Sequence, residues 1–480
     1  MIENPLIDSK RILEKAAEFS GEYLSNIYDR RVQPTKADRH SLQKLLMELP
    51  ELSCDPMQTL QLLQDAGSRN TVATAAGRYY GLVVGGSLPA CVGARVLNAA
   101  WDQLATTEAT SPIAVYLEKV VAGWIRDLFG LHAQTSVGLV TGSTMGNFIC
   151  LAAARHRILS RQGWNVERNG LNGAPPMRVV ASQEIHVTVK KVVSMLGLGS
   201  SNMELVPCDD NGVMRVEKMP KLDANTIVLA QAGNVNSGAI DPISDIVKLT
   251  KRADAWLHID GAFGLWAAAS PSKQHLLNGL DQVDSCVTDG HKWLNTPYDC
   301  GIAMCIDPEA MHQAMSTVAP YLLMHTDSNS QRGVPEMESK DVEPKDMVPE
   351  LSRSARSLEL WAALHSLGRN GLADLIDRCC RHADLAARLL SDHGFEILND
   401  LVLNQIVVSH PQKEHAIEEL TSRVCASGET WFGITRWQGR VGFRMSFSSW
   451  VSTDEDVKRS VEAIIVHAID MDIISKPFSA

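Results

Sequence analysis

Short apolar runs alternate with helical stretches through the middle of this 480-residue chain, and that alternation restricts its fold more than any other feature. The runs are VGLV (137–140), MRVVAS (177–182), TIVLAQAG (226–233), AWLHID (255–260), DSCVTD (284–289) and CGIAMCID (300–307). Each run ends at glycine or polar residues. Strands that alternate with helices form α/β domains around a mostly parallel sheet that is buried on both faces. A ligand should then bind beyond the strand ends, where the polar residues fall.

Helical patterns flank this region. We predict helices over 8–30, 36–66 and 111–130, the last with Ser111 as cap and Pro112 at its first position. Two more are predicted over 354–368 and 371–394. The polar, proline-bearing stretch 322–350 lacks a regular pattern and is typical of a functional loop.

These patterns predict three segments. They are an N-terminal helical segment over 1–70, a large α/β domain over 71–350 that includes the loop 322–350, and a small C-terminal α+β domain over 351–480. No internal repeat interrupts this order.

Composition excludes several classes of protein. The net charge is −11, from 45 Lys+Arg against 56 Asp+Glu, which disfavours a nucleic-acid-binding surface. No apolar run approaches the length of about 20 residues that spans a bilayer, and the N-terminal residues lack the features of a signal peptide. No C-x-x-C or H-E-x-x-H motif supports a metal site. We therefore expect a cytoplasmic protein without a metal, a membrane or a nucleic acid as partner.

Lys292, in TDGHKWLN (288–295), follows a predicted buried strand. Most lysines are surface charges, so this residue alone indicates little. A desolvated lysine can form a Schiff base with an aldehyde cofactor such as pyridoxal phosphate. Such a cofactor needs a carboxylate at its pyridine nitrogen, and Asp260 ends the apolar run 255–260. A strand-ending aspartate that caps a turn is the alternative interpretation.

Two further sites fit the same cofactor. Gly142, Ser143 and Thr144 lie between a strand and a helix, where a phosphate can bind the helix N-terminus. His186 follows another strand and is placed to stack on the ring or move a proton. Each has a simpler reading, as an ordinary strand-to-helix connection and as a packed turn residue. The ordered set of turn, His, Asp and Lys, all at strand ends, points to the cofactor.

This ordered set resembles the group II pyridoxal-phosphate-dependent amino-acid decarboxylases, which include aromatic-amino-acid, tyrosine and glutamate decarboxylases. The resemblance extends from about residue 70 to 470. It implies the type I (aspartate-aminotransferase-like) fold and a homodimer with shared active sites, in which we expect the N-terminal segment 1–70 to pack on the partner subunit. It also implies decarboxylation of an L-amino acid to an amine and carbon dioxide through a Schiff base on Lys292.

The resemblance also implies roles for individual residues. Gly142, Ser143 and Thr144 match the phosphate turn, and His186 matches the residue that stacks on the ring. In Asp260-Gly261-Ala262, the aspartate would pair with the pyridine nitrogen and Ala262 would lie beneath the ring. Further matches are Asp289 and His291 near the phosphate, Ser357 toward the neighbouring subunit's phosphate, and Arg444 at the substrate carboxylate.

The loop 322–350 departs from the family pattern because it contains no tyrosine. Many relatives use a loop tyrosine to return a proton to the substrate carbon. His325 is the loop residue with a pKa in the neutral range, and Tyr321, His186 and Lys292 are the other candidate donors. Relatives without the tyrosine can let oxygen intercept the carbanion and form an aldehyde, so decarboxylation-coupled oxidative deamination is the alternative reaction.

Substrate identity is weakly encoded. Tyr80, in GRYYGLVVGG, belongs to a segment that shapes the side-chain pocket in relatives, although it could equally be a core residue. The motif AQAGNVNSG (230–238) also departs from the family. Gln231 and Asn234 could still hydrogen-bond near the cofactor's phenolic oxygen or the substrate, but we assign them no role. A non-catalytic scaffold is disfavoured by the intact Lys292, and a Rossmann nucleotide binder by the lack of G-x-G-x-x-G after a strand.

Overall fold

The computed structural model describes residues 5–317 and 343–475, and its contacts divide the chain into two compact units. The first unit comprises residues 1–86, 381–398 and 406–480. The second unit comprises residues 87–380 and 399–405. Each unit is therefore assembled from separate stretches of the chain.

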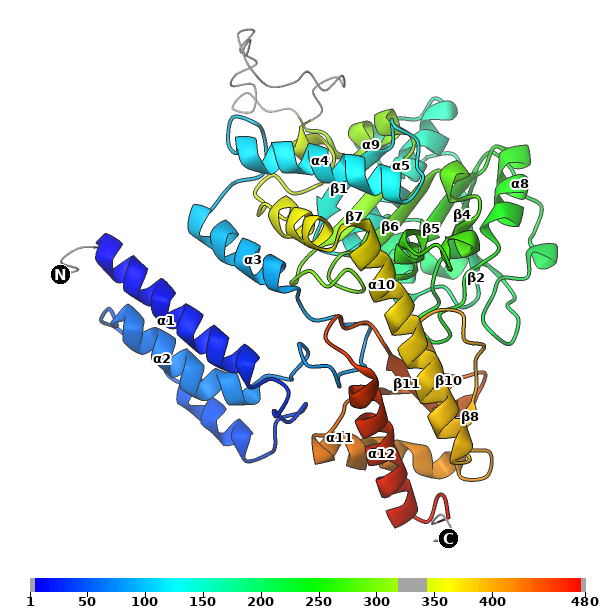
Figure 1. The fold of residues 1–480 in the computed structure, drawn as a ribbon. Helices are drawn as coiled ribbons and strands as arrows, with labels where there is room; N and C mark the ends of the chain where they lie inside the picture. The colour runs from blue at the N-terminus through cyan, green and yellow to red at the C-terminus, as the bar shows by residue number, and fades with distance from the viewer. Residues whose placement is uncertain (1–4, 318–342, 476–480) are drawn as a thin grey trace. The chain divides into compact units, whose positions relative to one another are not determined.

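A seven-stranded sheet forms the centre of the second unit, with the order β1-β7-β6-β5-β4-β2-β3. Figure 1 shows β1, β7, β6, β5, β4 and β2 following one another in this order. Strand β7 is antiparallel to both β1 and β6, and every other pair is parallel. The prediction of an α/β fold with a mostly parallel sheet is confirmed. The strands are β1 (Ser136–Val140), β2 (Arg178–Ser182), β3 (Glu204–Val206), β4 (Thr226–Gln231), β5 (Trp256–Asp260), β6 (Ser285–Asp289) and β7 (Gly301–Cys305).

The strands β4 to β7 are buried along their whole length, which explains why they appear in the sequence as continuous apolar runs. Helix α5 packs against β1, β5, β6 and β7, and its apolar face joins a core with α7 and β2. The helices of this unit are α3 (Pro89–Trp101), α4 (Pro112–Leu128), α5 (Ser143–Arg161), α6 (Val166–Asn169), α7 (Val187–Met195), α8 (Ile243–Ala253) and α9 (Pro308–Met315). The predicted helix 111–130 is confirmed as α4, where the Ser111 hydroxyl accepts the Ala114 N–H at 3.3 Å.

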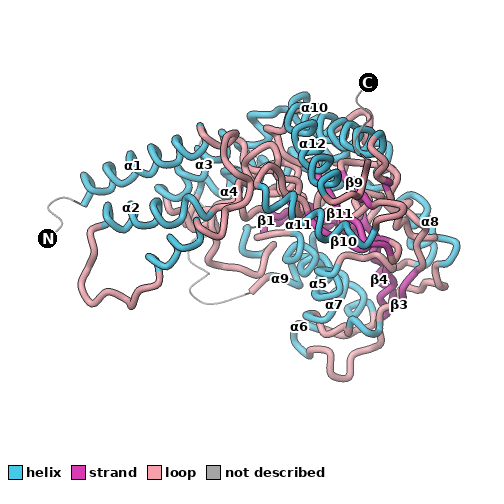
Figure 2. Tube along the Cα trace, turned by 90° about the horizontal axis from the view of Figure 1, so that it is seen from below, coloured by secondary structure: helices cyan, strands magenta, loops and turns pink. Residues whose placement is uncertain are grey.

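The first unit contains a four-stranded sheet with the order β10-β11-β9-β8. Its strands are β8 (Glu396–Ile397), β9 (Gln405–Ser409, of which Gln405 belongs to the second unit), β10 (Gly433–Trp437) and β11 (Arg440–Ser446). Its helices are α1 (Pro5–Ser25), α2 (Pro56–Gly67), α11 (Ile417–Ser427) and α12 (Asp454–Asp470). Helices α1 and α2 lie side by side in both Figure 1 and Figure 2.

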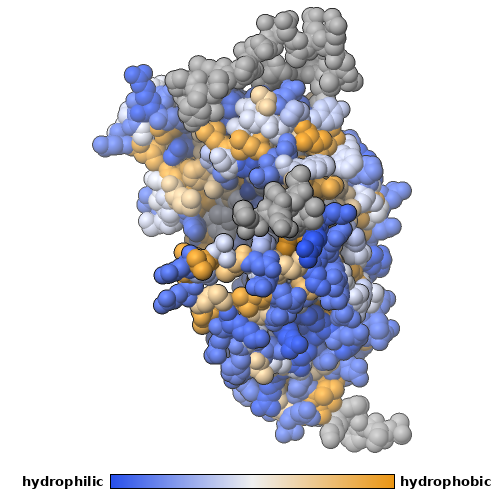
Figure 3. All heavy atoms as spheres, turned by 90° about the vertical axis from the view of Figure 1, so that its left-hand side faces the viewer, coloured by the Kyte–Doolittle hydropathy of each residue, from blue (hydrophilic) through white to orange (hydrophobic). Residues whose placement is uncertain are grey.

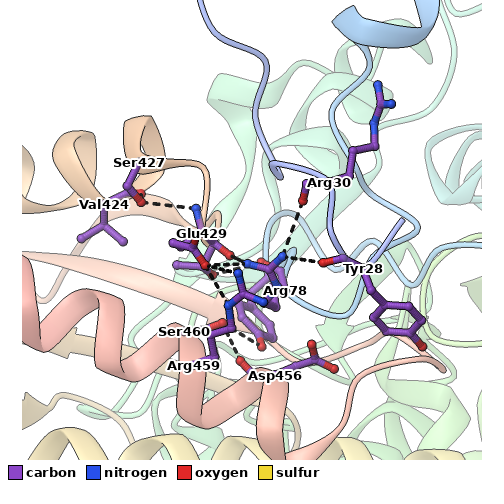
Figure 4. A network of polar contacts seen from close by, with 11 residues as sticks. Tyr28, Arg30, Arg78, Val424, Ser427, Glu429, Asp456, Arg459 and Ser460 are labelled. Atoms are coloured by element: carbon purple, nitrogen blue, oxygen red, sulfur yellow. Dashed lines mark hydrogen bonds and ion pairs between the residues drawn. The ribbon is translucent and has the colours of Figure 1, made fainter. Parts of the chain in front are cut away.

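Residues from the start of the chain are tied to this C-terminal sheet by buried polar contacts. Arg78 is only 2% exposed, and its guanidinium donates to the Tyr28 carbonyl at 3.0 Å and to Glu429 Oε2 at 3.0 Å (Figure 4). The Tyr80 N–H donates to the Trp431 carbonyl at 2.8 Å. The first unit is therefore held together by contacts between residues that lie about 350 positions apart, as the separation of 351 residues between Arg78 and Glu429 shows.

Helix α10 (Ser357–Asp392) passes from the second unit into the first and contains one non-helical residue, Gly368, with φ of 59°. This break agrees with the two predicted helices 354–368 and 371–394. The predicted segment ends at 70/71 and 350/351 fall inside the two contact-defined units, so the three-segment division stays a prediction about how the chain is organised.

The predicted helix 36–66 is wrong over its first half. The structure has a 3-10 helix at Asp38–Leu45, and α2 begins only at Pro56. Two prolines explain the break, because Pro50 and Pro56 lack an N–H and restrict the residue before them. The Asp55 side chain then caps α2 by accepting the Met57 N–H at 2.9 Å. Among the described helices, none has the length and apolar character to cross a membrane.

Candidate active site

The N-terminus of α5 meets the end of β6 at one edge of the sheet. The Ser143 N–H donates to Asp289 Oδ1 at 2.5 Å, so a carboxylate already occupies the positive end of this helix. Gly142 and Gly301 permit the close approach, since a Cβ on Gly301 would lie 2.4 Å from the Gly142 Cα. The predicted phosphate turn thus has the geometry of an anion site.

Lys292 follows β6 directly, and its Nζ lies 3.0 Å from Asp289 Oδ2. Asp289 is almost fully buried, while the Lys292 side chain keeps 21% of its surface exposed. A single buried carboxylate therefore links the predicted Schiff-base lysine to the predicted phosphate turn.

His291 is held beside them. Its Nδ1 accepts the Cys300 N–H at 3.1 Å, and its Nε2 lies 3.8 Å from Asp289 Oδ2. Burial lowers the pKa of His291, against an opposite effect of Asp289, so the ring is neutral with its proton on Nε2. The Tyr298 ring packs 4.4 Å from the His291 ring.

Asp260 ends β5, the strand next to β6, and is 6% exposed. Its Oδ1 accepts the Ala262 N–H at 3.1 Å and its Oδ2 accepts from Asn147 Nδ2 at 3.3 Å. The Ala262 carbonyl in turn accepts the Asp289 N–H at 2.8 Å, which joins the two strand ends. In the part of the chain that the structure describes, no cationic side chain forms an ion pair with Asp260.

His186 lies at the same edge of the sheet, beyond β2, and caps α7. Its Nδ1 lies 2.7 Å from the Thr188 hydroxyl and accepts the Thr188 N–H at 3.4 Å, and these contacts fix the ring. Thr144 belongs to the first turn of α5 and is half-buried. The second unit therefore brings Gly142, Ser143, Thr144, Asp260, Ala262, Asp289, His291 and Lys292 to one sheet edge, with His186 two strands from Asp260.

The remaining predicted residues lie elsewhere. Tyr80 is 1% exposed, and its ring packs 4.7 Å from Phe447 within the core of the first unit, which is the core alternative of the sequence reading. Arg444 also belongs to the first unit, on β11, where burial lowers its pKa and Tyr79 opposes this effect. Ser357 is fully buried, and its hydroxyl donates to the Ala114 carbonyl at 3.1 Å. His325 and Tyr321 lie outside the described residues.

Four further residues received no role of their own from the sequence. Gln231 and Asn234 are buried, and their amide nitrogens have no hydrogen-bond partner among the described residues. Asn147 and His258 are both fully buried and stand on the face of Asp260 that points to α5. His258 stands two residues before Asp260 on one strand, so both side chains point to the same face of the sheet. This spacing could have been recognised in the sequence.

This arrangement fits pyridoxal phosphate. An ionised carboxylate without a cation is costly to bury, and a protonated pyridine nitrogen would provide the cation that Asp260 lacks. The unpartnered amides of Gln231 and Asn234 are donors of the kind that a ligand's oxygen atoms satisfy. No cluster that could hold a metal ion occurs in the described ranges 5–317 and 343–475.

Comparison with known proteins decides the family. Residues 58–410 match the model of the pyridoxal-dependent decarboxylase conserved domain. The chain belongs to the pyridoxal-dependent decarboxylase family. This decarboxylase is thus a pyridoxal-phosphate-dependent carboxy-lyase, and the resemblance and cofactor inferred from its motifs are confirmed.

Its relatives differ in chemistry. The decarboxylase is 26% identical over 393 residues to the L-2,4-diaminobutyrate decarboxylase of Acinetobacter baumannii, covering 77% of this chain and 74% of that protein. It is 28% identical over 332 residues to the 4-hydroxyphenylacetaldehyde synthase of Rhodiola rosea, covering 64% and 61%. The crystal structure of Oryza sativa TDC with PLP and tryptamine has a TM-score of 0.88 at 21% identity, covering 98% and 99% of the two chains. This structural likeness confirms the type I fold.

Proposed function

We propose that this decarboxylase converts an L-amino acid to an amine and carbon dioxide, with Lys292 as the residue that binds the cofactor aldehyde. The observation that carries the proposal is the linkage of Lys292, Asp289 and the α5 N-terminus at the strand edge that also holds Asp260. Bound pyridoxal phosphate supplies an electron sink for the electron pair that stays on the substrate carbon when carbon dioxide leaves.

Each residue then has a defined task. The turn of Gly142, Ser143 and Thr144 would bind the phosphate near the positive end of α5, with Asp289, which accepts the Ser143 N–H, and His291 beside it. With the cofactor bound, Asp260 would pair with its ring nitrogen, and Ala262 and His186 would contact the ring. Lys292 would bind the cofactor aldehyde and, after carbon dioxide has left, would take the aldehyde back so that the amine is released. These assignments are proposals, as are those of Ser357, Arg444, Tyr80 and His325.

The visible spectrum tests this function. The purified protein loaded with pyridoxal phosphate should show an absorption band that borohydride discharges, and mass spectrometry should locate the reduced adduct on Lys292. Lys292→Ala should lack both. Lys273→Ala is a matched control, because Lys273 instead donates to the Val402 carbonyl at 2.9 Å. A wild-type protein that neither gains the band nor releases carbon dioxide from any amino acid would refute the proposal.

A second reaction has support from two observations. The segment 322–350 contains no tyrosine, and one relative is a 4-hydroxyphenylacetaldehyde synthase. In that reaction the amino acid, O₂ and water give an aldehyde, carbon dioxide, ammonia and hydrogen peroxide. Parallel assays of oxygen uptake, peroxide and amine separate the two reactions. Amine formed in equal amount with carbon dioxide, without oxygen uptake, excludes the aldehyde pathway.

We also propose that the chain forms a homodimer with shared active sites. Helices α3 and α4 of the second unit expose several large apolar side chains, and Figure 3 shows apolar side chains, in orange, at the surface of the face in view. Those on the two helices are Val96, Leu97, Trp101, Ile113, Tyr116 and Trp124. Apolar patches of this kind mark interaction surfaces.

A further inference from the structure

A chain of buried polar side chains runs through the second unit and ends on Asp260. Trp256 Nε1 donates to Ser285 Oγ at 2.9 Å, and Ser285 Oγ lies 2.9 Å from His258 Nδ1. His258 Nε2 lies 2.7 Å from Asn147 Oδ1, and Asn147 Nδ2 donates to Asp260 Oδ2 at 3.3 Å. All five residues are at most 6% exposed.

The directions of these hydrogen bonds follow from the donor at Trp256 and from the acceptors available to the Ser285 hydroxyl. An indole N–H can only donate, so Ser285 Oγ accepts from Trp256 and has its own proton to give. That proton goes to His258 Nδ1, since the Cys150 thiol, which also lies beside Ser285, is a weak acceptor. A neutral imidazole with an accepting Nδ1 carries its proton on Nε2.

His258 is neutral in this setting. Burial lowers its pKa to about 3, and no charged group opposes that effect. Its Nε2–H therefore donates to Asn147 Oδ1, which turns the amide so that Nδ2 faces Asp260. With the Ala262 N–H on the other oxygen, both oxygens of Asp260 accept hydrogen bonds from within the protein.

We propose that Ser285, His258 and Asn147 are positioning residues that keep Asp260 a hydrogen-bond acceptor and thereby keep the shared proton on the cofactor's ring nitrogen. The inference rests on the proposed function, in which Asp260 pairs with that nitrogen. In the reversed arrangement Ser285 Oγ would accept from both Trp256 and His258, and its own buried O–H would be left with only the weakly accepting Cys150 thiol, which disfavours reversal.

The experiment uses pyridoxal phosphate labelled with ¹⁵N in the ring. Its nitrogen chemical shift in the loaded protein reports whether the ring nitrogen is protonated, with the free cofactor titrated in solution as reference. His258→Met removes the donor to Asn147 at similar volume, whereas His258→Gln retains an amide that can donate there. Asn147→Leu removes the donor to Asp260. Thr250→Val serves as control, because it deletes a buried hydroxyl on α8 that takes no part in the hydrogen bonds from Trp256 to Asp260.

We expect His258→Met and Asn147→Leu to shift the ring ¹⁵N signal toward the unprotonated reference and to lower kcat by about ten- to a hundredfold, with little change in KM. His258→Gln should restore most of both readouts, and Thr250→Val should match the wild type. If His258→Met does not fold, Ser285→Ala replaces it, with a smaller shift in the same direction because His258 Nδ1 loses its donor.

The positioning role would be overturned if two folded variants both kept the wild-type ¹⁵N signal, namely Asn147→Leu together with either His258→Met or Ser285→Ala. The proposed function would remain intact in that case. A wild-type protein without a borohydride-sensitive band, or whose ring signal equals that of the free cofactor, would instead refute the proposed function.

Discussion

Two buried aspartates at one sheet edge have opposite partners. Asp289 accepts from the α5 terminus and pairs with Lys292, so its charge is balanced within the protein. Asp260 accepts only from neutral N–H groups in the described contacts. This difference assigns Asp260, and not Asp289, to a cation that arrives with a ligand.

Asp260→Asn should therefore lower kcat by about 10²–10³-fold while cofactor binding is retained in part, because the change removes the charge that supports the electron sink. Steady-state kinetics and cofactor absorbance measure the two effects. Asp284→Asn is the control, as Asp284 lies at the opposite end of β6 beside Lys251. Unchanged turnover in Asp260→Asn would contradict the assignment.

The sequence identified Lys292, Asp260 and the phosphate turn because motif order and strand ends carry that information. It did not indicate that Asn147 contacts Asp260 or that Tyr80 is a core residue. Asn147 contacts Asp260 only because α5 packs on β5, and the burial of Tyr80 depends on Phe447, more than 360 residues away. Such contacts arise from tertiary packing, which local pattern does not encode.

Asp241 gives the stability a pH dependence of its own. Burial raises its pKa to about 6, against the hydrogen bonds from the Met214 and Gln231 N–H groups. Because its pKa is higher in the folded state, this carboxyl makes its full contribution to the free energy of unfolding below pH 3.8, its pKa in the unfolded chain. The contribution is lost as the pH rises toward 6. Its loss amounts to about 3 kcal/mol.

Urea unfolding between pH 4 and 7 measures this loss. Asp241→Asn should show a flatter pH profile over that interval than the wild type, because the titrating group is gone. It should also be less stable at pH 4 by about 1–3 kcal/mol, since an amide cannot accept both N–H groups. Parallel profiles for the two proteins would show that Asp241 does not titrate in this range.

At the scale of elements, β7 determines how closely α5 approaches the site. Gly301→Ala would place a methyl group 2.4 Å from the Gly142 Cα, in contact with backbone that cannot rotate away. We expect a loss of stability of about 1–3 kcal/mol, together with weaker cofactor binding.

Gly123→Ala is the matched control for this prediction. Gly123 is inside α4, and a Cβ there meets no atom within 4 Å. This change should stabilise the protein by about 0.5–1 kcal/mol. Thermal unfolding compares the two variants, and equal behaviour would show that the approach of β7 to Gly142 is not tight.

Element types were predictable where a cap or a proline marks a boundary, as at Ser111 and Pro112 in α4. The direction of β7 was not, because an apolar run has the same appearance in a parallel and an antiparallel strand. The predicted helix 36–66 was too long, because its apolar spacing was given more weight than the prolines that interrupt it.

At the scale of the whole molecule, the exposed apolar side chains of α3 predict a solution dimer. The double variant Val96→Asp, Trp101→Asp should dissociate it, because charges would be buried without partners in the interface. Analytical ultracentrifugation measures the mass of the protein in solution. Activity should fall when the dimer dissociates if the active sites are shared. Leu205→Asp, on β3, is the control, since Leu205 is similarly exposed outside α3 and α4. A double variant that sediments like the wild type would exclude this surface.

The first unit joins residues 1–86 to residues 381–398 and 406–480. During synthesis, the ribosome must add 294 residues between Gly86 and Arg381, which takes roughly 15–60 s at about 5–20 residues per second. The C-terminal partners of Arg78 and Tyr80, namely Glu429, Trp431 and Phe447, do not exist during that interval. The N-terminal residues therefore wait with apolar surface exposed while the second unit folds, and this is the period in which the nascent chain most needs a chaperone.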